Sequence, residues 1–263
     1  MLFLLVSAFV FILGLIFGSF FNVCIHRFPR EQSIVWPGSK CPSCGKSIAW
    51  YDNVPILSFL ILGGCCRNCK SEISHRYWAV EAVCGFFFLW IWFYFGPTGK
   101  GLTAVILFSL LFVATVVDIE HQIIPDEVSL GGMIFGLLLS TFIPSLHHEL
   151  IWWRSLIQSF IGLLAGGGVI YLTGTLGNWI FRKDSMGGGD IKLLAMLGSF
   201  LGWQKVLMVY FLAPVLALPP GLFLRFVKRK EMIPFGPFLS LAGWLAFLFG
   251  DQFIAWYFHR LQF

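Results

Sequence analysis

The 263-residue chain has the composition of a membrane protein. Hydrophobic residues make up 58% of it, charged residues 12%, and its mean hydropathy is +0.83. Soluble globular domains carry about 25% charged residues, so a soluble enzyme is excluded. The net charge of +5 is explained by basic loops beside anionic lipid, and we expect no nucleic-acid partner.

Eight apolar stretches approach the length of a membrane crossing, which needs about 20 residues. They are residues 2–24, 77–95, 102–117, 128–144, 155–181, 191–203, 206–226 and 235–258. The sequence therefore predicts an all-α polytopic membrane protein with about eight transmembrane helices. The first stretch has neither the basic start nor the small-residue cleavage site of a signal peptide, so we expect it to be a helix.

The distribution of Lys and Arg predicts the orientation, because basic residues in short loops stay on the cytoplasmic side. An amino terminus outside places 14 of them in inner loops and 4 in outer loops. We accordingly expect a first transmembrane helix over residues 1–25, a cytoplasmic domain over 26–76, and a seven-helix membrane domain over 77–263.

Two Cys-x-x-Cys pairs in the cytoplasmic segment predict a metal site with the ligands Cys41, Cys44, Cys66 and Cys69. Each pair can hold one side of a tetrahedral ion, which favours zinc. A structural zinc would help to fold a segment too small for a large core. Disulfides are disfavoured in the reducing cytosol, unconnected thiols do not account for the paired spacing, and Cys65 could replace Cys66 as a ligand.

Two carboxylates stand at predicted helix ends on the inner face. Asp118 ends the third helix, and Asp190 follows three glycines and opens the sixth, which is too short for a full crossing and should hold Asp190 below the surface. Paired carboxylates share a proton, so one acts as base and the other as acid, as in an aspartic peptidase. The alternative is that Asp118 and Asp126 cap helix ends and that Asp190 is a first-turn charge. We interpret Asp126 as a cap, and Asp118 with Asp190 as the catalytic pair.

Two other patterns concern packing and charge. The spacings Gly132-x-x-x-Gly136 and Gly162-x-x-x-Gly166 predict close helix contacts rather than chemistry. Glu120, Asp126 and Glu127 follow Asp118 in a stretch without Lys or Arg, and this acidic patch would attract a basic substrate segment.

The chain resembles the bacterial type IV prepilin peptidases, also called leader peptidase/N-methyltransferases, along nearly its whole length. The resemblance rests on Gly18-Ser19-Phe20-Phe21-Asn22-Val23, Arg27, Pro29, the cysteine pairs with Trp50-Tyr51-Asp52-Asn53 between them, Asp118, Ile124-Pro125-Asp126, Lys183, Met186-Gly187-Gly188-Gly189-Asp190-Ile191-Lys192-Leu193 and Pro234-Phe235-Gly236-Pro237-Phe238. Departures are the doubled Cys65-Cys66 and Asp184 where a Glu is common.

The resemblance implies that Asp118 and Asp190 are catalytic. It also implies that leaders are cut from type IV prepilins or pseudopilins at the cytoplasmic face of the bacterial inner membrane. Methylation of the new amino terminus by S-adenosylmethionine would follow, as in the family members that carry the paired cysteines. The sequence has no glycine-rich nucleotide fingerprint, so the methyl-donor pocket is not assigned. Glu81 is one candidate polar group for it, and the alternative is an interfacial charge.

Two other classes of function are weighed against this one. A presenilin-like intramembrane protease would share the Gly-x-Gly-Asp aspartate but does not account for the four cysteines. A transporter or membrane scaffold would pair its carboxylates with cations or spread them through the bilayer depth, whereas Asp118 and Asp190 are expected at one face.

Overall fold

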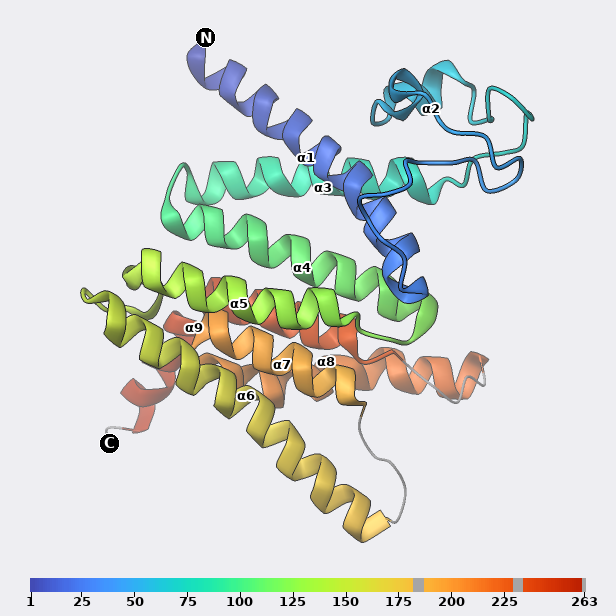
Figure 1. The fold of residues 1–263 in the computed structure, drawn as a ribbon. Coiled ribbons are helices and arrows are strands. Elements are labelled where there is room, and N and C mark those ends of the chain that lie inside the picture. Colours follow the sequence, from blue (N-terminus) through green and yellow to red (C-terminus); the bar gives the residue numbers. More distant parts are fainter. Residues whose placement is uncertain (182–186, 229–233, 262–263) are drawn as a thin grey trace. The chain divides into compact units, whose positions relative to one another are not determined.

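In the computed structural model, which describes residues 1–181, 187–228 and 234–261, the regular structure is helical (Figure 1). The longer helices are α1 (Leu2–Arg27), α3 (Arg76–Phe95), α4 (Gly99–His121), α5 (Asp126–Phe142), α6 (Trp152–Phe181), α7 (Gly188–Leu201), α8 (Trp203–Lys228) and α9 (Gly236–Leu261). Four short elements connect them: η1 (Phe28–Arg30), η2 (Trp50–Asn53), α2 (Leu57–Ile61) and η3 (Pro144–His147). Lys183 and Asp184 lie outside the described residues.

Six of these helices, α1, α3, α4, α6, α8 and α9, are long and apolar enough to cross a membrane by themselves. The all-helical, multi-pass architecture expected from the sequence is confirmed. The other two predicted crossings correspond to α5, with 17 residues, and α7, with 14. At 1.5 Å per residue α7 is about 21 Å long, which is short of the 30 Å hydrocarbon layer.

The chain divides into two compact units, residues 1–105 and 106–263, with the boundary inside α4. In the first unit α1 packs directly on α3 (Figure 1). Gly14 and Gly18 allow this contact, because a Cβ atom on either would lie 2.7 Å from the backbone of Cys84 or Glu81. Small residues one turn apart thus let the two helices meet backbone to backbone.

In the second unit α7 lies between α5 and α6 and contacts both along its length. Gly132 and Gly136 of α5 leave no room for a Cβ atom beside the side chains of Met196 and Ser199. The prediction that these glycines serve packing is confirmed, and the buried core of the unit forms around α7, where residues 193–201 are all buried.

The contact between α6 and α7 is closer still. A Cβ atom at Gly162 would collide with the carbonyl oxygen of Gly198, and one at Gly166 would collide with that of Leu194. Ser159 of α6 also donates a hydrogen bond of 2.6 Å to the carbonyl of Ser199. The first turn of α7, which carries Asp190, is therefore held on a rigid helix pair.

Candidate active site and metal centre

Asp118 lies in the last turn of α4 and is 6% exposed. Its Oδ2 accepts a hydrogen bond of 2.8 Å from the backbone N–H of Gly236, the first residue of α9. A Cβ atom at position 236 would lie 2.8 Å from that Oδ2 and 3.1 Å from Cγ, so only glycine fits without a shift. The carboxylate of Asp118 is therefore held against the start of a helix, where the exposed N–H groups favour negative charge.

Asp190 lies in the first turn of α7, and the glycines before it allow that turn to approach a neighbouring loop. A Cβ atom at Gly189 would be 3.1 Å from Cβ of Ile124, in the connection between α4 and α5. Burial, and secondly the negative charge of Asp118, raises the pKa of Asp190 from 3.8 to about 6. The first turn of α7, which carries Asp190, therefore lies beside the connection that follows Asp118 at the end of α4.

Asp126 is not a helix cap, and that prediction is wrong. Pro125 is the N-cap of α5 and no side chain caps the helix. The Asp126 carboxylate instead pairs with Lys192, whose Nζ lies 2.6 Å from Oδ1 and 2.8 Å from Oδ2. This ion pair, missed in the sequence, joins the first turns of α5 and α7 two residues beyond Asp190.

Two interacting carboxylates that share one proton can bind and activate a water molecule, and a raised pKa on one of them favours that singly protonated state. The ionised group removes a proton from water while the protonated group donates to a carbonyl oxygen. Among the described residues the polar partner of Asp118 is a backbone N–H, and neither carboxylate forms an ion pair of the kind that an ion pathway would require.

The four predicted metal ligands lie in two loops of the first unit that share one backbone pattern. The N–H of Cys41 bonds the carbonyl of Lys46, and the N–H of Cys66 bonds that of Ser71. The residue after each second cysteine, Gly45 or Lys70, has a positive φ of 70° or 58°. Each Cys-x-x-Cys pair is thus a tight turn that points two sulfur atoms in one direction.

The sulfur atoms of Cys41, Cys44, Cys66 and Cys69 all lie within 4.8 Å of one another, and those of Cys41 and Cys69 are 3.8 Å apart. A tetrahedral ion with Zn–S bonds of about 2.3 Å requires sulfurs about 3.8 Å apart, so the cluster fits zinc. Hydrogen bonds from the backbone of Cys44 and Ser43 help to lower the pKa of Cys41 to about 6, which favours the thiolate that a metal binds. Cys65 is not part of this cluster.

Two family models match the chain. Residues 12–95 match the family model described as the bacterial peptidase A24 N-terminal domain, and residues 105–222 match the type IV leader peptidase family. Proteins named prepilin leader peptidase/N-methyltransferase are similar along almost the whole chain. That of Stutzerimonas stutzeri is 34% identical over 94% of this chain and 91% of its own length. The chain belongs to the type IV leader peptidase family.

Two further relatives carry the same name. The protein of Pseudomonas aeruginosa is 33% identical over 92% of this chain and 89% of its own, and that of Aeromonas hydrophila is 34% identical over 94% and 92%. The search of solved structures found no significant match to the chain. The family resemblance expected from the sequence motifs is confirmed, and the chain is a peptidase of this family.

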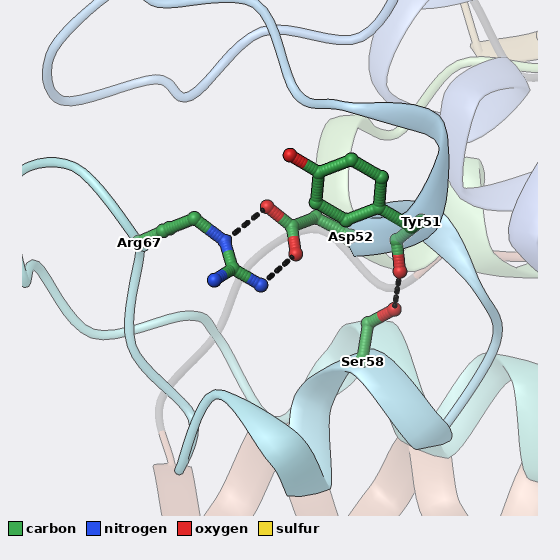
Figure 2. A network of polar contacts seen from close by, with 4 residues as sticks. All are labelled: Tyr51, Asp52, Ser58 and Arg67. Carbon is green, nitrogen blue, oxygen red and sulfur yellow. Dashed lines mark hydrogen bonds and ion pairs between the residues drawn. The ribbon is translucent and has the colours of Figure 1, made fainter.

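A salt bridge fastens the second cysteine turn of this peptidase to η2 (Figure 2). Arg67, between Cys66 and Cys69, donates to both carboxylate oxygens of Asp52 at 2.8 and 2.6 Å, and its guanidinium lies 5.5 Å from the ring centre of Tyr51. Ser58 of α2 donates to the carbonyl of Tyr51 at 3.0 Å. These contacts link η2 to α2 and to the metal-binding turn, so the family motif around Asp52 has a structural role.

Glu81 is buried in α3 at 8% exposure, so it is not an exposed charge on the surface of that helix. Its carboxylate accepts a hydrogen bond of 2.8 Å from the N–H of Ile56, a residue with a positive φ of 60°, and a second from Ser19. Asn22, 3% exposed, donates to the carbonyl of Tyr77 at 3.0 Å. Family-motif residues of α1 thus join α3, and Glu81 ties the connecting segment to this helix pair.

Proposed function

We propose that this protein is a membrane aspartic endopeptidase that removes leader peptides from type IV prepilins or pseudopilins, with Asp118 and Asp190 as its catalytic residues. The observation that carries the proposal is the placement of both carboxylates: Asp118 is buried at the end of α4, and the α7 turn that carries Asp190 closely approaches Ile124 in the connection that follows α4. The family and the names of the relatives support the substrate class.

We propose that the active site faces the cytoplasm at the bacterial inner membrane, with the amino terminus in the periplasm, and the basic side chains expected in the inner loops support this orientation. An apolar pilin helix would stay in the lipid while its leader extends into the cytoplasm. The scissile bond then reaches the carboxylates where α4 ends and α7 begins.

The acidic patch beside the site is smaller than the sequence suggested. Lys192 neutralises Asp126, which leaves Glu120 and Glu127 as the acidic members. Glu120 lies 3.9 Å from His121 and both are partly exposed. We propose that these two glutamates attract the basic leader, an interaction that salt would screen.

We also propose that residues 26–76 form a cytoplasmic zinc-binding domain, with a first transmembrane helix at 1–25 and the membrane peptidase domain at 77–263. Cys41, Cys44, Cys66 and Cys69 would hold one structural zinc. The name of the relatives supports methylation of the new amino terminus with S-adenosylmethionine as donor.

The test is to incubate the purified protein in detergent with a prepilin, with and without S-adenosylmethionine, and to read the product masses. We expect loss of the leader in both reactions and a gain of one methyl group only with the donor. Asp118→Asn and Asp190→Asn should each lower the cleavage rate by about 100-fold or more, because an amide neither accepts nor cycles the proton. Folding is checked by size-exclusion elution, and near-normal cleavage by either folded variant would disprove the catalytic pair.

A further inference from the structure

The motif Pro234-Phe235-Gly236-Pro237-Phe238 has no role in the proposed reaction so far, yet its glycine contacts Asp118 directly. The two residues are 118 positions apart in the chain. Gly236 is buried, begins α9 and has no room for a side chain on the Asp118 side. The motif therefore places one backbone N–H against one catalytic carboxylate.

The two carboxylates differ in this respect. Asp118 accepts the N–H of Gly236 at 2.8 Å at the positive end of α9. In the part of the chain that the structure describes, no hydrogen-bond donor is found on the Asp190 carboxylate, although the residue lies in the first turn of α7. A hydrogen bond to the charged form of a carboxylate stabilises that form, so the negative charge is favoured on Asp118.

We propose that Gly236 is a positioning residue that sets the division of labour between the aspartates, keeping Asp118 ionised as the base and leaving the shared proton on Asp190 as the acid. This inference rests on the proposed function, since it assumes that the pair is catalytic.

The reaction then balances in two steps. The oxygen of the water molecule attacks the scissile carbonyl carbon while Asp118 takes a proton from that water. Asp190 gives its proton to the carbonyl oxygen, which yields a gem-diol. Asp118 next gives its proton to the amide nitrogen as the C–N bond breaks. Asp190 takes back a proton from one gem-diol hydroxyl, so both residues return to their starting states and no covalent intermediate forms.

The surroundings agree with this assignment. Burial, and secondly the charge of Asp118, raises the pKa of Asp190 to about 6, and a raised pKa favours the protonated form that an acid requires. The other charged groups around the pair in the described segments are the Asp126–Lys192 ion pair, which joins α5 to α7, and Glu120 with His121 beyond Asp118 on α4. The charges of Asp126 and Lys192 offset each other, and the Gly236 N–H remains as the local donor to Asp118.

The test is the pH profile of kcat/KM for prepilin cleavage by Gly236→Ala. The added Cβ must displace the Asp118 carboxylate from the N–H. We expect the acid limb of the profile to move to higher pH by about one unit, because a hydrogen bond to a charged group is lost. At acidic pH kcat should fall about tenfold, while KM changes less than twofold.

The control is Gly243→Ala, on the same helix, where the atoms nearest to the added Cβ belong to the side chain of Leu197. It should lower the unfolding temperature without moving the acid limb. If Gly236→Ala does not fold, the Phe235–Gly236 amide is replaced by an ester through glycolic acid at position 236, which removes the N–H and adds no side chain. This variant should show the same shift of the acid limb.

An unmoved acid limb in folded Gly236→Ala, or in the ester variant, would overturn the inference while leaving the proposed function intact. Failure of the proposed function looks different, because Asp118→Asn or Asp190→Asn would then still cleave. An equal shift in Gly243→Ala would also overturn the inference, since it would show that the profile responds to general strain in α9.

Discussion

Asp190 is held in a position that favours its neutral form, which has a consequence for stability. Its pKa in the folded protein, about 6, lies above its ordinary value of 3.8, through burial first and the charge of Asp118 second. Below about pH 4 the group is protonated in both folded and unfolded chains and costs nothing. Between about pH 4 and pH 6 it ionises in the unfolded chain before it ionises in the folded protein, so the free energy of unfolding decreases over this interval and does not change further with this group at higher pH.

Asp190→Asn should therefore be more stable than wild type at pH 7.5, by on the order of 1–2 kcal/mol after allowance for solvent at the site. The difference should vanish near pH 4. Thermal unfolding in detergent at the two pH values measures it. A variant less stable than wild type at pH 7.5, or equally stabilised at both pH values, would contradict this account of Asp190.

At the scale of elements, the glycine contacts of α7 predict where the fold tolerates a methyl group. Gly162→Ala on α6 should lower the free energy of unfolding by about 1–3 kcal/mol, because the added Cβ would collide with the backbone of α7 at Gly198. Gly168→Ala, on the same helix with open space around it, is the matched control and should have no such effect. Chemical denaturation of both proteins gives the comparison, and equal stabilities would mean that the helix pair relaxes at little cost.

The two cysteine turns predict one zinc per chain. Replacing Cys41, Cys44, Cys66 and Cys69 together with Ser should abolish zinc in freshly purified protein, because a hydroxyl is a far weaker ligand than a thiolate. Cleavage should be reduced less than by Asp118→Asn, since the metal organises residues 26–76 and not the attacking water. Elemental analysis and the cleavage assay decide the matter, and full zinc content in the Ser variant would exclude this ligand set.

At the scale of the whole molecule, the short helices α5 and α7 decide the topology. If α5 crosses the membrane, Gln122 before it and Glu149 after it face opposite sides. We expect the cysteine added by Gln122→Cys to raise labelling by a membrane-impermeant maleimide above that of the seven native cysteines only after the cells are opened. One at Glu149→Cys should react from the periplasm in intact cells. Labelling of both from the same side would leave α5 as a helix that does not cross.

Local patterns predicted much of this molecule. Apolar run lengths gave the helical, membrane-spanning class, glycine spacing predicted the contact faces of α5 and α6, and the cysteine spacing matched the cluster that forms. Sequence could not predict the hydrogen bond from Gly236 to Asp118 or the ion pair of Lys192 with Asp126, since each joins residues far apart in the chain. The cap assigned to Asp126 failed because a tertiary partner competed with the local backbone for its carboxylate.

The backbone contact between α6 and α7 also bears on motion. Helices that meet through side chains can slide by exchanging rotamers, whereas Gly162 and Gly198 leave no side chain to rearrange. We therefore expect α7 to stay still during turnover, with backbone amides that exchange slowly with deuterium. The helix better suited to yield to an incoming pilin is α8, where Pro214, Pro219 and Pro220 each remove a backbone hydrogen bond. We therefore expect Asp190 to stay fixed on α7 while α8 bends to admit the substrate.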